Sequence, residues 1–289
     1  MGRDDIDLSR LSKRPLDPND RRSYNDDCGS LRVSCSGTAL RGRDRSVKRS
    51  RRRICPLASK NLVLVARRAE PMEALAVELC RQYQVQVIVE PLDLGVVDSA
   101  NALKKLLDDR GVSPDILINN AAFGHHGQFL DMDLFRIRDL VQLDILSTVE
   151  LTHVFGRAMR DRGRGNILIV ASLAAYQPTP IMTIYGAAKS FILSFGEALN
   201  VELAPKVGVT VISPGLMATE FNQVAGFNPG ASAKVSMLPP GVVAEMGIEA
   251  MFSHKSSRVA GKLNTLSVFF MRFLSRHVMA KIAYRMSTE

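Results

Sequence analysis

The chain has 289 residues, of which 46% are hydrophobic and 23% charged, a composition that supports one folded domain with appended segments. Its formal charge of +9 is concentrated in residues 41–53, which hold eight Arg or Lys residues and one Asp. The rest of the chain is close to balanced, so a general nucleic-acid-binding role is excluded. No apolar run reaches the about 18 residues needed to span a bilayer, and the polar N-terminal sequence does not resemble a signal peptide. We therefore expect a cytoplasmic location.

Residues 1–56 are rich in Arg, Asp, Ser and Gly and show neither helical nor strand periodicity. A segment of this composition cannot bury enough apolar surface to order itself, so we predict that it is disordered. The four cysteines lack paired C-x-x-C spacing, which favours reduced thiols over a disulfide framework or a metal site; they are Cys28, Cys35, Cys55 and Cys80.

From Asn61 onward, predicted strands and helices alternate. Leu62–Val65 is a continuous apolar run of the kind found in strands buried on both faces. A helix follows, with Pro71 in its first turn and apolar residues at helical spacing: Met72, Leu75, Ala76 and Leu79. The pattern then predicts strands at 85–89, 116–118, 167–170 and 209–212 and helices at 100–107, 135–159 and 185–203.

This alternation favours right-handed crossovers and therefore a Rossmann-like, doubly wound parallel sheet. We assign residues 57–262 to this α/β domain. In such sheets ligands bind beyond the carboxyl ends of the strands. Polar or turn-forming residues directly follow each predicted strand, namely Arg67, Arg68, Asp93, Asn119, Asn120, Ser172, Pro214 and Gly215.

One pair of residues suggests proton transfer. Tyr185 and Lys189 are separated by one helical turn, which places the phenol and the ammonium on one helix face, where the cation lowers the tyrosine pKa. A tyrosine tuned in this way can exchange a proton with a carbonyl or alcohol oxygen. Ser172, thirteen residues earlier at a strand end, can hydrogen-bond the same oxygen. Taken alone, the Y-x-x-x-K spacing is also compatible with an ordinary amphipathic turn.

These three residues, with Asn119-Asn120-Ala121 after a strand and Pro214-Gly215 followed by Thr219, resemble the short-chain dehydrogenase/reductase family in order and context. The resemblance implies a nicotinamide-dependent oxidoreductase that interconverts a carbonyl and a secondary alcohol. It also implies roles for the residues that match the family motifs.

In the family, the residue matching Tyr185 is the general acid/base, the one matching Lys189 binds the cofactor ribose, and the one matching Ser172 orients the substrate oxygen. By the same resemblance, Asn119 supports the central strand and the cofactor, and Thr219 contacts the nicotinamide amide. The pair after the strand at 85–89 is similar to the family's adenine-contacting pair; it consists of Asp93 and Leu94.

The choice of cofactor depends on the end of the strand at Leu62. NAD enzymes place a carboxylate there, whereas this chain has Arg67 and Arg68. Guanidinium groups suit the additional phosphate of NADP, so we predict NADP(H) rather than NAD(H). The alternative is a solvated arginine pair on a loop.

The chain departs from the family at its fourth catalytic position, where Asp144 stands in place of an asparagine. An ionised carboxylate near Tyr185 opposes phenolate formation, and one that engages Lys189 weakens the influence of that lysine. Both effects predict slower turnover. Alternatively, Asp144 is a tolerated acceptor for the water of a proton relay.

A second departure lies upstream of Leu62. The family opens with a strand and a G-x-x-x-G-x-G turn that binds the pyrophosphate, and no such pattern is present. We therefore expect the sheet to lack its first strand and glycine-rich turn. One hypothesis is a reading-frame error, because codons for Leu40–Ser46 can be chosen that yield Ser-Gly-Ala-Gly-Ile-Gly one base later. The other is a divergent, basic extension.

Three further features surround the predicted site. His125 and His126 are adjacent without a third ligand, so we expect a substrate-side loop and no metal. Phe221–Pro240 occupies the place of the family's substrate lid. Its apolar content favours an apolar carbonyl or alcohol substrate, although core packing accounts for the same residues equally well. Residues 263–289 are expected to form a basic amphipathic helix that contacts a membrane surface, the domain itself or a second copy of the chain.

The sequence is therefore compatible with two functions. The first is an NADP(H)-dependent reductase or dehydrogenase, in which the cofactor supplies the redox chemistry and the protein orients and protonates. The second is a catalytically impaired or inactive relative, or a misread gene product, as suggested by Asp144 and the missing glycine turn. Binding of the cofactor by the chain distinguishes them.

Overall fold

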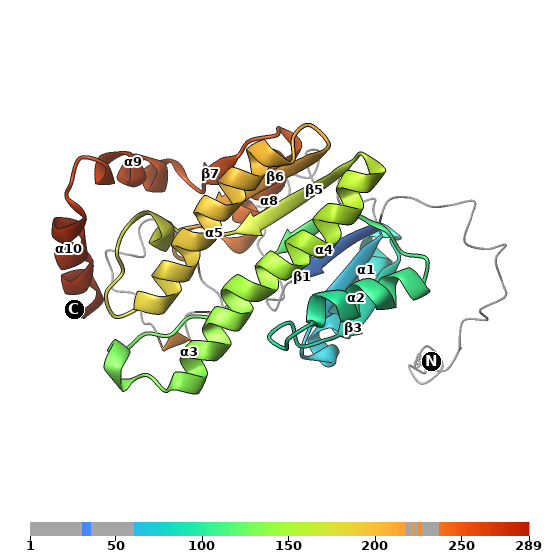
Figure 1. Cartoon of the computed structure of the whole chain (residues 1–289), viewed down its shortest axis with the longest axis horizontal. Helices are drawn as coiled ribbons and strands as arrows, with labels where there is room; N and C mark the ends of the chain where they lie inside the picture. Colours follow the sequence, from blue (N-terminus) through green and yellow to red (C-terminus); the bar gives the residue numbers. More distant parts are fainter. Residues whose placement is uncertain (1–30, 36–60, 218–220, 222–224, 227–236, 289) are drawn as a thin grey trace, which may run out of the picture.

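The computed structural model describes residues 31–35, 61–217, 221, 225–226 and 237–288. Within these residues, seven strands form one sheet in the order β3-β2-β1-β4-β5-β6-β7 (Figure 1). All neighbouring strands are parallel. The strands are β1 (Leu31–Cys35), β2 (Leu62–Ala66), β3 (Val87–Pro91), β4 (Pro114–Asn119), β5 (Gly165–Val170), β6 (Val207–Ser213) and β7 (Ser257–Val259).

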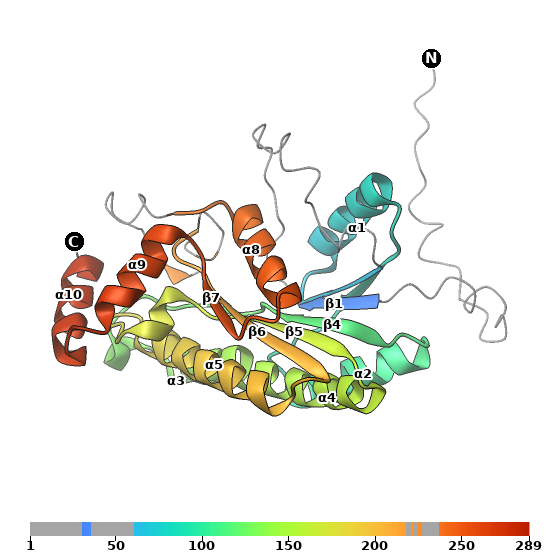
Figure 2. The same ribbon diagram turned by 90° about the horizontal axis from the view of Figure 1, so that it is seen from above.

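Helices cover both faces of the sheet, as Figure 2 shows. Helices α1 (Ala69–Tyr83) and α8 (Pro240–Phe252) lie on one face. On the other face lie α2 (Ser99–Asp109), α4 (Ser147–Arg162) and α5 (Thr183–Glu202). Helix α3 (Leu134–Val141) precedes α4, and the short helices are η3 (Phe129–Asp131), η4 (Gln142–Leu146) and η5 (Leu173–Tyr176).

The strands are apolar on both faces because each face has its own core. One core joins alternate residues of the central strands, such as Leu117 and Ile167, to Phe155 of α4 and Ile192 of α5. The other joins the intervening residues, such as Leu168, to α8. This arrangement confirms the predicted doubly wound α/β class, in which parallel strands are buried on both sides.

The predicted strands and helices between Leu62 and Ile212 are all present, with small shifts of their ends. The expectation that the sheet lacks its first strand is wrong. Leu31–Cys35 forms β1 between β2 and β4, pairing Val33 with Val63 and with Leu117. The physical reason is that two neighbouring central strands need a backbone partner between them, and a five-residue segment inside a charged region gives too weak a pattern to find.

The predicted disorder of residues 1–56 is consequently wrong for residues 31–35. The other residues of that segment lie outside the described residues, and so does the stretch 36–60, in which the glycine-rich turn was expected to be missing.

The single predicted C-terminal helix is two helices, α9 (Lys262–Met271) and α10 (Arg276–Thr288). Ser275 separates them, because its hydroxyl oxygen accepts a hydrogen bond from the backbone N–H of Val278 at 3.3 Å. A serine in this position satisfies an otherwise unpaired donor of the helix N-terminus. The apolar and basic periodicity was identified correctly, but it runs across a helix boundary. Among the described residues, no helix is both long and apolar enough to cross a bilayer.

Candidate active site

The site lies at the carboxyl edge of the sheet, where β4, β5 and β6 end beside α4 and α5. Asn119 ends β4, Ser172 follows β5, and Pro214 follows β6. Tyr185 and Lys189 lie in the first two turns of α5. Residues that are more than fifty positions apart in the sequence therefore meet at one edge, as the parallel topology requires.

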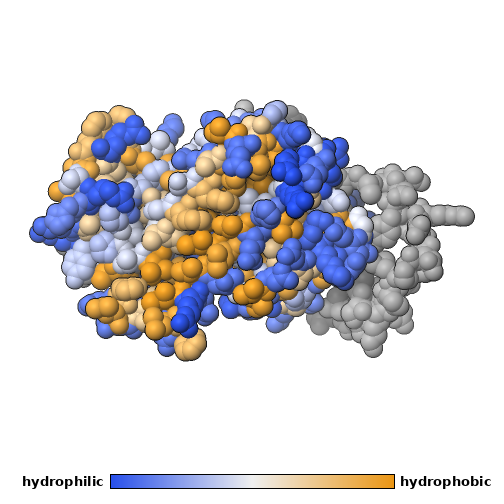
Figure 3. Space-filling view, viewed as in Figure 1, coloured by the Kyte–Doolittle hydropathy of each residue, from blue (hydrophilic) through white to orange (hydrophobic). Residues whose placement is uncertain are grey.

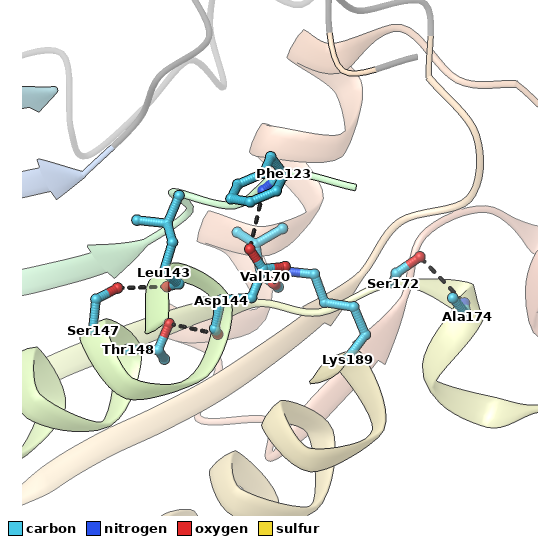
Figure 4. A network of polar contacts seen from close by, with 9 residues as sticks. All are labelled: Phe123, Leu143, Asp144, Ser147, Thr148, Val170, Ser172, Ala174 and Lys189. Carbon is cyan, nitrogen blue, oxygen red and sulfur yellow. Dashed lines mark hydrogen bonds and ion pairs between the residues drawn. The ribbon is translucent and has the colours of Figure 1, made fainter. Parts of the chain in front are cut away.

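A π-helical segment sets the position of Asp144. The turn η4 interrupts the helical region between α3 and α4, and its backbone bond runs from Ser147 to Gln142. The Ser147 hydroxyl donates to the Leu143 carbonyl at 2.5 Å, and the Thr148 hydroxyl donates to the Asp144 carbonyl at 3.3 Å. Such hydroxyl contacts compete with the helical ladder. The local widening turns the Asp144 side chain toward the sheet edge (Figure 4).

Asp144 is 1% exposed and is held by two contacts. Its Oδ1 accepts a hydrogen bond from the backbone N–H of Phe123 at 3.0 Å, and its Oδ2 lies 3.6 Å from Nζ of Lys189. Burial raises the pKa of Asp144 above its usual value, while the Lys189 charge and the Phe123 N–H oppose that rise. The carboxyl is thus placed against a cation in surroundings that disfavour its charge.

Lys189 is buried, with 4% of its surface exposed. Its ammonium donates to the Val170 carbonyl at 3.2 Å, so the lysine is held by the end of β5 on one side and by Asp144 on the other (Figure 4). The same nitrogen lies 5.6 Å from the centroid of the Tyr185 ring. The Lys189 ammonium therefore lies near both a carboxyl and a phenol, and each of these groups can be stabilised in its negatively charged form by the same positive charge.

Tyr185 lies in the first turn of α5, and its ring packs against Phe221 with centroids 5.2 Å apart. The next residue, Gly186, lies against the Thr179 side chain, with which a Cβ there would collide. Burial raises the pKa of the Tyr185 phenol, and the Asp144 charge raises it further, whereas a hydrogen bond with Ser172 lowers it. The Tyr185 pKa is therefore raised and not lowered, contrary to the prediction from the Tyr185–Lys189 spacing, because burial outweighs the nearby positive charge.

Ser172 begins the 3-10 turn η5, where its hydroxyl oxygen accepts from the backbone N–H of Ala174 at 3.2 Å (Figure 4). The turn is tied to β6 because the N–H of Leu173 donates to the Pro214 carbonyl at 2.8 Å. The serine is also hydrogen-bonded with Tyr185, so the serine hydroxyl and the phenol lie beside one another.

Asn119 joins the central strand to α4. Its Nδ2 donates to the Thr152 hydroxyl at 2.9 Å in a buried contact. Its Oδ1 is buried and has no hydrogen-bond partner among the described residues. A buried acceptor of this kind is suited to a donor from outside the described residues. Thr152 was not identified from the sequence, since a threonine in a helix gives no distinctive signal.

The residues expected near the adenosine end of a cofactor differ in their exposure to solvent. Arg67 and Arg68 are exposed at the end of β2. Asp93 is exposed, and its carboxylate accepts from the Gly95 N–H at 2.9 Å. The Leu94 side chain, in contrast, is 3% exposed and belongs to the core, so it is not presented at the surface.

The remaining predicted site residues also differ in their surroundings. Asn120 and Ala121 are half-buried directly after β4, and Ala121 packs on the core. Gly215 lies against the Asn264 side chain of α9, which leaves no room for a Cβ. Asn264 is a buried residue that was not identified from the sequence. Thr219, and most of the predicted lid at 221–240, lie outside the described residues.

A doubly wound parallel sheet with buried polar residues at its carboxyl edge defines the class of α/β proteins that bind nucleotides at this edge. The family model described as short chain dehydrogenase matches residues 56–228, which is more than half of the chain. The chain therefore belongs to the short-chain dehydrogenase family, a family of oxidoreductases.

Relatives with assigned names match part of the chain. A very-long-chain 3-oxoacyl-CoA reductase of Phaeosphaeria nodorum is 29% identical over 177 residues, covering 58% of this chain and 51% of that protein. An 11-beta-hydroxysteroid dehydrogenase A of Sesamum indicum is 30% identical over 173 residues, covering 58% of this chain and 49% of that protein. The chain spans about half the length of these relatives.

Solved structures agree with the fold. A structure described under 7beta-hydroxysteroid dehydrogenase stereoselectivity has a TM-score of 0.75 and 21% identity, covering 88% of this chain and 96% of the other. A short-chain dehydrogenase from Sphingobium yanoikuyae in complex with NADPH has a TM-score of 0.67 and 22% identity, covering 86% of this chain and 97% of the other.

Proposed function

We propose that the protein is an NADP(H)-dependent oxidoreductase that interconverts a carbonyl and a secondary alcohol. The observation that carries this proposal is the grouping of Tyr185, Lys189 and Ser172 at the carboxyl edge of β5. In a member of this oxidoreductase family, such a grouping supplies a proton donor, a cation and an orienting hydroxyl around one substrate oxygen.

When bound, the nicotinamide supplies or accepts the hydride. The residues of the chain manage the proton. In the reducing direction the Tyr185 phenol gives its proton to the carbonyl oxygen, and in the oxidising direction its phenolate takes the proton of the alcohol. Ser172 donates a hydrogen bond to the same oxygen. Lys189 favours the phenolate, because a positive charge near a phenol lowers its pKa.

The described residues offer suitable groups for the cofactor. Lys189 has an ammonium with donors beyond the one given to Val170, and we assign it to the cofactor ribose. The buried Oδ1 of Asn119 offers an acceptor near the end of β4. Arg67 and Arg68 are exposed at the end of β2, where paired guanidinium donors suit a 2′-phosphate.

We propose NADP(H) rather than NAD(H) on the basis of these arginines. The Sphingobium yanoikuyae neighbour is described in complex with NADPH, and an alcohol dehydrogenase from Thermococcus sibiricus is described with 5-hydroxy-NADP. These descriptions support the choice by analogy.

An apolar substrate is the best match to the surroundings of Tyr185. The ring lies beside Phe221, and the neighbouring half-buried apolar residues include Phe123 and Ile184. Relatives are named for steroid and very-long-chain oxoacyl substrates, which favours a large apolar carbonyl compound here.

We also propose self-association. Leu146 and Phe191, on the face formed by α3, α4 and α5, are 42% and 44% exposed, and Figure 3 shows a continuous hydrophobic area across this face. Large exposed apolar areas mark interaction surfaces. Sedimentation of the protein with and without Phe191→Ser tests this: a shift to monomer supports it, and an unchanged monomeric species contradicts it.

An impaired catalyst is the second candidate, and the ion pair of Asp144 with Lys189 favours it specifically. A carboxylate at this distance offsets the ammonium charge that Tyr185 requires. The protein would then bind cofactor and substrate but turn over slowly.

The decisive experiment combines binding and turnover. Calorimetric titration with NADPH and NADH measures cofactor affinity, and the loss of NADPH absorbance measures reduction of a steroid ketone, a 3-oxoacyl thioester and an aromatic ketone. We expect tighter binding of NADPH and turnover of at least one ketone. Binding without turnover would favour the impaired catalyst, and absence of binding would overturn both functions.

A further inference from the structure

The two C-terminal helices expose large apolar side chains beside basic ones. In α9 and the turn after it, Leu263, Leu266, Phe270 and Phe273 follow one another at intervals of three or four residues, and their exposed fractions are 58%, 53%, 56% and 69%. Leu274, Val278 and Ile282 continue the exposed apolar surface into α10. Together we call the exposed side chains of residues 262–285 the α9–α10 surface.

The α9–α10 surface is also strongly positive. Residues 262–288 contain five Lys or Arg residues and no Asp or Glu; the five are Lys262, Arg272, Arg276, Lys281 and Arg285. Charge and apolar surface are adjacent, since the Arg272 guanidinium lies 5.3 Å from the Phe269 ring centroid. In α10 the side chains of Val278, Lys281 and Ile282 recur at helical spacing on one exposed face.

Both helices also have buried residues. In α10, Met279 and Ala283 are buried, so the exposed stripe lies beside a buried one. In α9, Asn264 is buried, donates to the Ala260 carbonyl at 2.7 Å and fits against Gly215. The helices extend at one end of the molecule, away from the sheet (Figure 1, Figure 2). The space-filling view shows hydrophobic and hydrophilic side chains together at this end (Figure 3).

Charge distinguishes the possible occupants of this surface. A two-fold symmetric contact with a second copy brings the same patch of both chains together. The side chains of Lys262, Arg272, Arg276 and Lys281 would then face their own counterparts, and residues 262–288 contain no Asp or Glu. An anionic lipid surface offers both a negative potential for the Lys and Arg residues and an apolar phase for the Phe and Leu side chains.

We infer that the α9–α10 surface docks the protein on an anionic lipid bilayer, with the helices lying in the interface. The inference is independent of catalysis. Because α9 packs beside Gly215 and η5, the docked surface is one helix away from Ser172, so an apolar substrate dissolved in the bilayer would be close to the site.

The test is sedimentation of the full chain with vesicles of phosphatidylcholine alone and vesicles containing about one third phosphatidylserine. Each basic residue near an anionic surface contributes about 1 kcal/mol, or about fivefold in affinity. We therefore expect the triple variant Arg272→Gln, Arg276→Gln, Lys281→Gln to lose about 100-fold in affinity for the anionic vesicles. The double variant Phe270→Ser, Phe273→Ser should also lose binding, since it removes the inserted apolar area.

The control is a triple variant of exposed basic residues on other elements, Arg81→Gln, Arg157→Gln, Lys206→Gln. It carries the same change of net charge and should keep at least a third of the wild-type affinity. Sedimentation equilibrium without vesicles tests the competing occupant. Failure of the wild type to bind anionic vesicles, an equal loss in the control, or a dimer that Phe270→Ser, Phe273→Ser converts to monomer would each overturn the inference.

The readout separates this inference from the proposed function. Vesicle binding requires neither cofactor nor turnover, so an inactive protein that binds anionic vesicles supports the inference. An active protein that ignores them contradicts it.

Discussion

The polar residues at the carboxyl edge of the sheet fall into two regions with opposite surroundings. Around β5 and α5, Asp144 and Lys189 are almost fully buried and contact one another. At the ends of β2 and β3, Arg67 and Asp93 are exposed. Burial makes each polar group depend on its partners, because an unpaired buried group costs free energy. Exposed charges are screened and can be exchanged.

The difference separates two kinds of effect. Changes in the buried region should alter the rate and its pH dependence, since they change which group carries a proton. Changes in the exposed region should alter which cofactor binds while leaving the chemical step intact. Four substitutions test this difference between the buried and the exposed region.

The largest effect is expected for Tyr185→Phe. The substitution removes the hydroxyl that we propose exchanges the proton, so kcat/KM should fall about 100- to 10,000-fold. NADPH affinity should change less than about threefold, because other residues are proposed to hold the cofactor. Steady-state kinetics and calorimetry measure the two quantities. Tyr176→Phe is the matched control, since the Tyr176 hydroxyl donates to the Ser213 hydroxyl at 3.4 Å and is given no part in the proposed proton transfer. A fully active Tyr185→Phe protein would remove Tyr185 from its assigned role.

In the exposed region, Arg67→Asp should weaken NADPH binding about 10- to 100-fold, because it replaces a charge-assisted contact with a repelling carboxylate. NADH affinity should stay the same or improve, so the preference between the two cofactors narrows. Calorimetric titration with both cofactors measures the change. Arg81→Asp on α1 alters the net charge equally and should leave the preference intact. An unchanged preference in Arg67→Asp would show that this position does not contact the phosphate.

Asp144→Asn isolates the effect of the buried charge, because it keeps the shape of the side chain and removes its charge. The Asp144 charge raises the pKa of Tyr185, so its removal should lower that pKa. In the oxidising direction the rate rises as Tyr185 loses its proton. We therefore expect the rising limb of the pH profile to move to lower pH and kcat/KM at neutral pH to increase up to about tenfold. An unaltered profile with reduced activity would favour a proton-relay role for the carboxylate.

The same substitution has a distinct signature in stability. Burial raises the pKa of Asp144 above the unfolded value of 3.8, so the stability that it contributes is fully present below that value and is lost as pH rises through the folded pKa. Asparagine does not titrate. The melting temperature of Asp144→Asn relative to the wild type should therefore increase with pH across this window. A difference that is constant with pH would show that the carboxyl pKa is not raised.

The sequence predicted the sheet from Leu62 onward because continuous apolar strands and helical spacing are strong, local signals. It missed β1, since Leu31–Cys35 lacks the continuous apolar run of β2 and its place in the sheet is decided by pairing with β2 and β4. It also merged α9 and α10, because apolar periodicity does not register the cap supplied by Ser275.

For the site, motif and strand-end context were sufficient to group Ser172, Tyr185 and Lys189. Spacing could not show that Asp144 lies in a π-helical turn, because a π-helical turn differs from an α-helical one in its backbone hydrogen bonds and not in a residue pattern. Nor could spacing show that Asp93 is exposed while the neighbouring Leu94 is buried. The helical turn and the burial of these side chains both depend on three-dimensional packing.

The smallest effect on turnover is expected for Thr152→Val. This substitution changes a buried contact that has no part in the proposed proton transfer. The Thr152 hydroxyl accepts the hydrogen bond of the buried Asn119 side chain at 2.9 Å, and valine leaves that amide without its partner. An unsatisfied buried donor costs about 1–3 kcal/mol in the free energy of unfolding, and each kcal/mol lowers the melting temperature of a domain of this size by about 2–4 °C.

We expect kcat of Thr152→Val to change less than about threefold, since Asn119 is positioned by β4 as well. Thr265→Val is the matched control, because the exposed Thr265 hydroxyl donates to the carbonyl of Gly261, the N-cap of α9, and the melting temperature of this variant should stay near that of the wild type. Calorimetric melts and steady-state kinetics on both variants measure the effect. A large loss of kcat at unchanged stability would instead show that the Asn119–Thr152 contact is part of the reaction itself, so that the buried region could not be divided into a catalytic and a structural part.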